Sequence, residues 1–140
     1  AYTFRVQARN TLFPATFGAL SAASNAVTPA TVPNPPTIVS VTGGVTTDAA
    51  VNATVVWNPP ANTGGLAITS YTLRVVQLQA DQVTPVDGGT RTITGIGTGV
   101  NARNRTVGQL VAGAPYRFEV MAVNALGASA PAVSTVVIAN

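Results

Sequence analysis

PYRFEVMAVN, the stretch Pro115–Asn124, alternates apolar and polar residues in the manner of a half-buried β-strand. The first ten residues read AYTFRVQARN and repeat this pattern near the opposite end of the chain. Five positions are identical, so that Tyr2, Phe4, Val6, Ala8 and Asn10 correspond to Tyr116, Phe118, Val120, Ala122 and Asn124. The chain therefore carries two versions of one strand, and its organisation has to account for both.

The composition excludes several classes of site. The 140 residues are 46% hydrophobic and only 8% charged, which predicts one folded domain with a fragment of another. Without Cys or His, no disulfide, thiolate metal site or Ser-His-Asp arrangement is available. The net charge of +3 comes from scattered arginines, so we expect no nucleic-acid partner. Prolines interrupt the long uncharged stretch before Thr47, so we also expect no membrane span.

Alternation of two, β-branched residues and frequent Gly, Pro and Asn turns predict strands throughout. We place a turn at 86–89 and a loop at 97–104. The expected strands cover residues 37–42, 53–58, 68–78, 91–96, a segment beginning at 105–107, 116–124 and 132–139. Seven strands over this length predict an all-β, seven-stranded immunoglobulin-like β-sandwich.

The core of this sandwich is expected to contain the large side chains on the inward faces of its strands. They are Trp57, Tyr71, Leu110, Tyr116, Phe118 and Val120. Glu119 alternates with this buried set, and we therefore expect it to be solvated.

The ordered set of residues resembles the fibronectin type III domain over nearly the whole chain. Trp57 followed by Pro59 and Pro60 is similar to the end of that family's second strand. Leu110-x-Ala112-x-x-x-Tyr116 resembles its tyrosine corner, in which the hydroxyl bonds to the upstream backbone, although Pro usually stands where Ala112 does. The resemblance implies a non-enzymatic module.

The proline-rich segment after the first strand resembles a junction between tandem copies in bacterial surface or secreted proteins. In this interpretation residues 1–28 are the last two strands of one copy, residues 29–36 are a linker, and residues 37–140 are the next copy. The chain does not begin with Met, so we expect a processed product or a piece of a longer protein.

The early hairpin needs a sheet to join, because a two-stranded hairpin is marginal alone. Leaving Tyr2, Phe4 and Val6 in water would forfeit roughly 5–9 kcal/mol. Upstream residues could complete a preceding domain, the hairpin could fold back on residues 33–111, or it could insert into a neighbouring chain. We predict a contact with another module or subunit through Tyr2, Phe4, Val6, Leu12, Phe13 and Phe17.

We predict no catalytic, cofactor-binding or metal-binding residues. Asp81 and Asp87 could approach a calcium ion, but their spacing fits no calcium motif. Gly95, Gly97 and Gly99 lack the basic helix start of a phosphate loop. The triplets that begin at Asn52 and Asn104 match the glycosylation pattern, which chance produces readily in a Thr-rich chain.

The leading hypothesis is a structural module of an extracellular or cell-surface bacterial protein. It would build a filament, sheath or tandem-repeat stalk, with copies of itself or neighbouring domains as partners. The alternatives are an adhesin or carbohydrate-enzyme accessory module with a glycan or cell-surface ligand of unknown identity, and a passive spacer.

Overall fold

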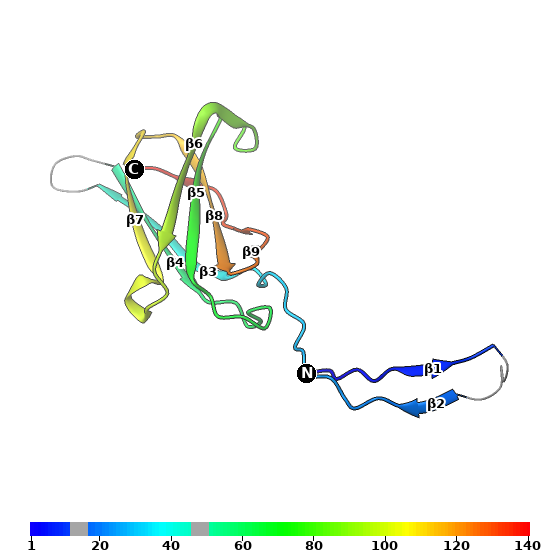
Figure 1. Ribbon diagram of the computed structural model, residues 1–140. Helices are drawn as coiled ribbons and strands as arrows, with labels where there is room; N and C mark the ends of the chain where they lie inside the picture. The colour runs from blue at the N-terminus through cyan, green and yellow to red at the C-terminus, as the bar shows by residue number, and fades with distance from the viewer. Residues whose placement is uncertain (12–16, 46–50) are drawn as a thin grey trace. The chain divides into compact units, whose positions relative to one another are not determined.

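The chain forms two units, Ala1–Ala30 and Thr31–Asn140. The computed structural model describes residues 1–11, 17–45 and 51–140 (Figure 1). The larger unit is a sandwich of two antiparallel sheets, and the smaller unit is a two-stranded ribbon. Each unit is described by itself below.

The first sheet of the sandwich has three antiparallel strands in the order β3-β4-β7. These strands are β3 (Thr37–Val45), β4 (Val51–Asn58) and β7 (Asn104–Leu110). Strand β4 shows the alternation that a half-buried sheet requires, because every second side chain from Val51 to Trp57 is buried. One face of this sheet therefore supplies half of the core.

The second sheet has the strand order β10-β8-β5-β6. Its main strands are β5 (Ser70–Leu78), β6 (Pro85–Ile96) and β8 (Pro115–Asn124). The short strands that pair with β8 are β9 (Gly127–Ala128), β10 (Ala132–Val133) and β11 (Val137–Ile138). The prediction of an all-β, immunoglobulin-like sandwich is confirmed.

The core lies between the two sheets and is closed by aromatic contacts. Trp57 of β4 meets Tyr71 of β5 edge to face, with ring centroids 5.5 Å apart. All six side chains expected in the core are buried, namely Trp57, Tyr71, Leu110, Tyr116, Phe118 and Val120. Burial raises the pKa of the Tyr71 phenol, so this side chain stays neutral inside the core.

The last strand differs from the continuous segment expected at 132–139, because serine side chains replace part of the ladder. Ser134 Oγ accepts a hydrogen bond from the Phe118 N–H at 3.0 Å, and Ser129 Oγ accepts one from the Ala122 N–H at 3.1 Å. Each serine N–H also donates to the carbonyl of the same β8 residue. The edge therefore pairs with β8 through three two-residue strands.

The expected turn at 86–89 is wrong, and so is the start of the strand after it. Residues 86–89 lie inside β6, which begins at Pro85. The chain instead reverses just before, where Gln79 N–H donates to Thr84 O at 2.7 Å. Gly88 adopts a φ of 69°, so it lets β6 bend within the sheet.

The expected loop at 97–104 contains one 3-10 turn, η1 (Val100–Ala102), and β7 already begins at its end.

The tyrosine corner is present at the start of β8. Val111 N–H donates to Tyr116 Oη at 3.0 Å, as the resemblance implied. Ala112 in place of the usual proline does not prevent this contact, because Gly113 takes up the turn with a φ of 78°.

We expect Tyr116→Phe to lower the free energy of unfolding by about 0.5–1.5 kcal/mol, the net value of one hydrogen bond. The cost stays in this range because Val111 is exposed, so water can replace the lost hydroxyl. Urea denaturation of both proteins measures the difference, with Tyr2→Phe as the matched control. A loss in Tyr116→Phe no larger than in that control would contradict the role of the corner.

The segment before β3 is fixed to the sandwich by Asn124. Its Nδ2 donates to Thr31 O at 2.8 Å and to Thr63 O at 3.0 Å, while its Oδ1 accepts from Leu126 N–H at 2.9 Å. Thr31 N–H also donates to Gly64 O at 2.8 Å. A side chain at Gly64, whose φ is 76°, would collide with Thr31 O. The backbone at Thr31 is therefore part of the sandwich unit.

The ribbon unit consists of β1 (Gln7–Arg9) and β2 (Phe17–Leu20), which pair antiparallel. An isolated bridge between Tyr2 and Val27 continues the pairing toward Ala1.

Candidate functional site: an exposed apolar hairpin face

The ribbon unit carries three large apolar side chains in the segment before β1. We call Tyr2, Phe4 and Val6 the hairpin face, since alternate residues of an extended chain point to the same side. Their exposed fractions are 63%, 63% and 72%. The corresponding residues of β8, Tyr116, Phe118 and Val120, are exposed by 4%, 0% and 0%. The same three residue types are therefore buried in the sandwich and exposed to solvent in the ribbon unit.

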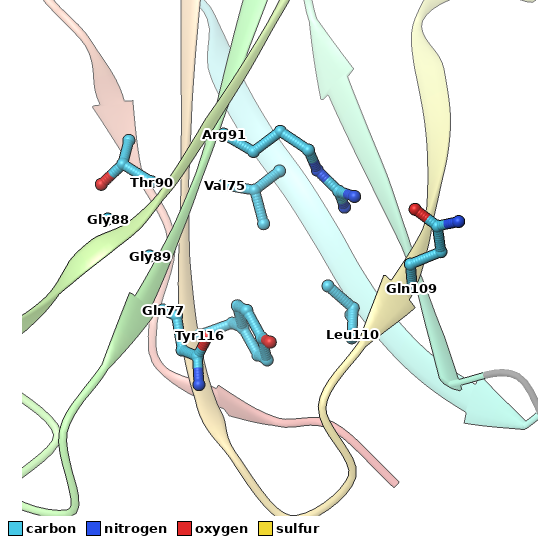
Figure 2. Close-up of a pocket in the computed structure, with 9 residues that line it drawn as sticks. All are labelled: Val75, Gln77, Gly88, Gly89, Thr90, Arg91, Gln109, Leu110 and Tyr116. Carbon is cyan, nitrogen blue, oxygen red and sulfur yellow. The ribbon is translucent and has the colours of Figure 1, made fainter.

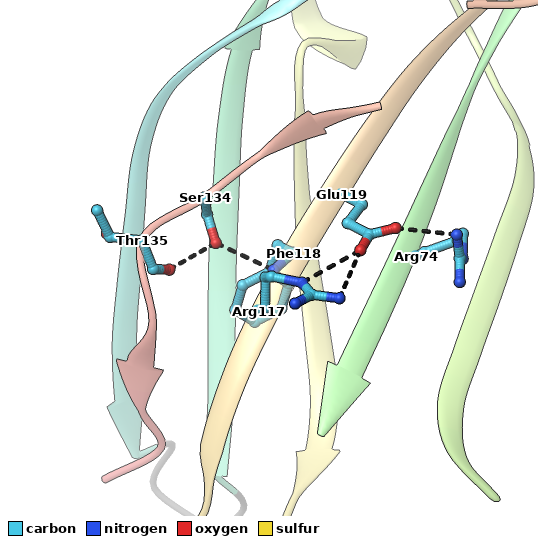
Figure 3. Close-up of polar contacts among 6 residues, drawn as sticks. All are labelled: Arg74, Arg117, Phe118, Glu119, Ser134 and Thr135. Atoms are coloured by element: carbon cyan, nitrogen blue, oxygen red, sulfur yellow. Dashed lines mark hydrogen bonds and ion pairs between the residues drawn. The ribbon is translucent and has the colours of Figure 1, made fainter. Parts of the chain in front are cut away.

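The ribbon repeats one hydrogen-bonded pair of β8 as well as part of its sequence. Phe4 N–H donates to Ser24 Oγ at 3.0 Å, and Ser24 N–H donates back to Phe4 O at 2.9 Å. Phe118 and Ser134 make the same two bonds at 3.0 and 2.9 Å. Figure 3 shows the serine of this second pair, whose hydroxyl also donates to Thr135 O at 2.6 Å. In the ribbon, Ser24 Oγ donates to the carbonyl of the next residue at 2.9 Å.

The ribbon and β8 also correspond at the next residue pair toward the N-terminal end of each segment. Tyr2 and Val27 exchange two backbone hydrogen bonds at 2.7 and 2.8 Å, and Tyr116 pairs with Val137 in β11. The spacing Ser-x-x-Val, from Ser24 to Val27, recurs from position 134 to Val137. This spacing was the sequence signal for the second strand, and the sequence reasoning did not use it.

The remaining predicted contact residues lie in or near the loop between the two ribbon strands. Phe17 is in β2 and is exposed, and the Arg9 guanidinium lies 5.7 Å from the centre of its ring. Leu12 and Phe13 lie outside the described residues.

The structure contradicts the arrangement in which the hairpin folds back on residues 33–111. That arrangement needs the edge of β5, and this edge is paired with β8 from Ser70 to Gln77. The other two arrangements of the hairpin remain open.

The expectation that Glu119 is solvated is wrong. Its side chain is 7% exposed, and it lies between two arginines on the outer face of the second sheet (Figure 3). Arg74 Nη1 lies 3.0 Å from Oε2, and Arg117 Nη2 lies 3.0 Å from Oε1. The long arginine side chains cover a position that alternation alone assigns to water. The signal was available in Arg117 and Glu119 two positions apart on one strand face.

A small open pocket lies between β6 and β7 (Figure 2). Its volume is about 180 Å³, below the roughly 300–1,000 Å³ of typical ligand pockets. Arg91 reaches across it, and its Nη2 donates to Gly108 O at 2.8 Å. Gln109 on its rim has a φ of 59°, where β7 bulges against β4. This pocket is a gap between sheet edges that one arginine bridges.

Asp81 has a structural role in the sandwich unit. Asp81 accepts hydrogen bonds from Thr84 Oγ1, Val83 N–H and Thr84 N–H, so its oxygens hold the turn before β6. Among the described residues, no cluster of three or more His, Cys, Asp or Glu could hold a metal ion. Within those same residues, no helix has the length and apolar character needed to cross a membrane.

The turn at Asp81 makes stability depend on pH in one direction. The hydrogen bonds of Thr84 and Val83 lower the pKa of Asp81, the Thr84 hydroxyl contributing most. A carboxyl group with a lowered folded pKa stabilises the fold above its unfolded pKa of about 3.9, and the contribution disappears as pH falls through the folded pKa.

We expect Asp81→Asn to be less stable than the parent at pH 6, with the difference shrinking toward pH 2. Thermal unfolding at a series of pH values measures this, and Asp87→Asn is the matched control. A gap that widens at low pH would contradict the assignment.

Comparison with known proteins places the sandwich in a family. The chain matches the fibronectin type III domain over residues 34–138. A Kelch domain-containing protein of Saccharolobus solfataricus is 35% identical over 112 residues, which cover 80% of this chain and 13% of that protein. The chain thus spans about an eighth of the length of this curated relative.

Solved structures agree on the fold. A human FNIII domain is 22% identical with a TM-score of 0.54, and the match covers 84% of this chain and 86% of that chain. The twitchin kinase region from C. elegans is 22% identical with a TM-score of 0.57, covering 78% and 17%. The FN1–FN3 domains of chicken CNTN1 are 16% identical with a TM-score of 0.53, covering 97% and 41%.

Proposed function

Because this chain belongs to the fibronectin type III domain family, we propose that it is a non-enzymatic structural module of an extracellular bacterial protein. In this proposal residues 1–28 are the end of one copy, residues 29–36 are a linker and residues 37–140 are the next copy. Copies follow one another end to end and build a surface filament, sheath or stalk. The fold is typically non-catalytic, which favours a mechanical or connecting role.

The observation that carries the proposal is the bare hairpin face. Tyr2, Phe4 and Val6 expose the pattern that the sandwich buries in β8. Three large side chains left in water forfeit roughly 5–9 kcal/mol, which is comparable to the stability of a whole domain. A surface of this kind on a folded protein marks a contact with another module.

The comparisons support an arrangement in series. The match to the FN1–FN3 domains of CNTN1 covers 97% of this chain, a share that residues 31–140 alone cannot supply. The match therefore extends into the ribbon unit. The curated relative is also far longer than this chain, as an array of modules requires.

Sedimentation velocity and electron microscopy test the proposal on the full chain. We expect association that increases with concentration and yields elongated particles, and we expect Phe4→Asp to abolish it. Val83→Asp is the matched control, since Val83 is as exposed as the hairpin face but lies in the turn before β6. A strict monomer at high concentration would exclude filaments that form through these ends.

One observation favours the second candidate, a glycan-binding module. Tyr2, Phe4 and Phe17 are exposed aromatic side chains on the ribbon unit, and such rings can stack on sugars. Binding of the monomer to a glycan array, lost in Phe17→Ala, would favour this candidate over the structural module.

A further inference from the structure

Three open hollows adjoin one another along the gap between β6 and β7, each of which is the outermost strand of its sheet. The first is the pocket described above, and Arg91 also lines the second, whose volume is about 230 Å³. Arg105 lines both the second and the third, whose volume is about 450 Å³. Because neighbouring hollows share a residue, they form one groove, which we call the edge groove. It follows all seven residues of β7 and is therefore about 20 Å long.

The edge groove is positively charged. Arg91 extends into it from β6 (Figure 2), Arg105 lines it from β7, and its described lining residues include no Asp or Glu. Arg91 Nη2 donates to Gly108 O, but among the described residues neither arginine forms an ion pair. A guanidinium group has five N–H donors. Both arginines therefore keep donors for an anionic ligand.

A third arginine adds charge at the end of the edge groove next to η1. Arg103 directly follows Ala102, which lines the third hollow. The Nε of Arg103 is buried and has no hydrogen-bond partner within the described parts of the chain. Buried donors are normally paired with an acceptor. The excess of donors at this end favours a ligand that brings acceptor atoms.

The backbone along the edge groove does not suit an added β-strand. Such a strand needs a regular row of free backbone groups. On β7, Arg91 already occupies the carbonyl of Gly108, and Gln109 has a φ of 59°. On β6, Gly88 and Gly95 both have a φ of 69°. Because irregularities of this kind block pairing at a sheet edge, a peptide that binds by strand addition is disfavoured.

The sparse charge of the edge groove also disfavours a nucleic acid. A nucleic-acid strand carries one charge in about 3.4 Å and is held by stacking on exposed aromatic rings. Tyr116, the one aromatic residue among the described lining residues, is buried. The lining instead offers side-chain amides, those of Asn101, Asn104 and Gln109, which can bond to sugar hydroxyl groups. A polysaccharide with well-separated carboxylates matches both features.

We propose that the edge groove binds an acidic polysaccharide whose carboxylates pair with Arg91 and Arg105. The site lies entirely within the sandwich unit, so it requires neither the hairpin face nor end-to-end assembly. It is also separate from the aromatic rings of the ribbon unit that favour the second candidate function.

Titration of the full chain with polygalacturonate, followed by amide chemical shifts, tests the proposal. We expect the largest shifts at residues 88–97 and 101–110, which contain the edge groove. Arg105→Gln should weaken binding about fivefold, as the loss of one exposed charge pair does, and Arg105→Glu should weaken it further. Raising NaCl from about 50 to about 200 mM should also weaken it, because salt screens exposed charges.

The matched controls are Arg5→Gln and Arg5→Glu, since Arg5 is exposed like Arg105 but lies in the ribbon unit. They should bind polygalacturonate as the parent chain does. Equal weakening by the Arg5 and Arg105 variants would show that only net charge matters and would overturn the site. Shifts confined to residues 1–30 would overturn it as well.

Other polymers test the proposed ligand under the same conditions. No binding of polygalacturonate, or equal binding of neutral dextran, would overturn the role of the carboxylates. Tighter binding of polyglutamate, single-stranded DNA or dextran sulfate would overturn the choice of a carboxylated polysaccharide. Sedimentation of the chain without any polymer measures assembly, so a failure of this proposal is distinguishable from a failure of the proposed function.

Discussion

We expect Phe118→Ala to lower the free energy of unfolding by about 3–5 kcal/mol, the usual cost of removing a fully buried aromatic side chain. Phe118 is 0% exposed and stacks with Tyr116, the ring centroids being 6.4 Å apart. The cavity left behind lies at the centre of the second sheet, where neighbouring strands limit collapse. Such a loss removes a large part of a typical domain's stability.

The chain offers a matched control for this substitution at the equivalent position of the ribbon. Phe4→Ala should change the free energy of unfolding of the sandwich by about 0.5 kcal/mol or less, because Phe4 is 63% exposed. Denaturation followed by the fluorescence of the single tryptophan, Trp57, reports both variants. Equal losses in the two variants would show that the hairpin face is already buried in the isolated chain.

The second large effect is expected at Asn124. We expect Asn124→Ala to lower the free energy of unfolding by about 2–4 kcal/mol, because three hydrogen bonds worth roughly 0.5–1.5 kcal/mol each are lost in a buried place. The amide of Thr31 should exchange faster, since its carbonyl no longer has the Asn124 donor. Denaturation and hydrogen exchange measure the two consequences separately.

A second variant, Asn124→Asp, tests the donor role of the Asn124 amide. It keeps the oxygen that accepts from Leu126 N–H, but it sets a carboxylate oxygen against the carbonyls of Thr31 and Thr63. Burial and these carbonyls raise the pKa of the new carboxyl group above its unfolded value. Its stability should therefore be higher at pH 4 than at pH 7, because the protonated form can donate. Wild-type stability in both variants would exclude a structural role for Asn124.

The fold could be predicted from the sequence because its strands alternate clearly. Residues 115–124 place three large or medium apolar side chains and Ala122 on one face, and this face is the centre of the observed core. Turn positions were harder to predict. Residues 86–89 have turn composition, but Asp81 and Thr84 close the turn earlier through side-chain hydrogen bonds between residues three positions apart. This Asp-x-x-Thr spacing is a local turn signal that the composition of residues 86–89 outweighed.

The candidate site was also predictable in part, because its residues follow the same strand alternation. Identity between the two strand copies identified Tyr2, Phe4 and Val6, and the resemblance indicated the tandem arrangement. Half of the environment of Glu119 was predictable from Arg117 on the same strand face, but the other half depends on Arg74 of another strand, which sequence alternation does not place. The partners of Ser24 were also missed, because a serine at a sheet edge is expected to be solvated.

The ribbon unit and β8 with its edge strands share a bonding pattern, and this similarity affects how the chain folds. While β5 is still unpaired, two segments that share five residues at alternate positions, 1–10 and 115–124, can pair with it. The partner nearer the N-terminus leaves a ribosome first, and synthesis proceeds at only about 5–20 residues per second. Residues 1–28 can therefore compete for the edge of β5 before β8 is synthesised.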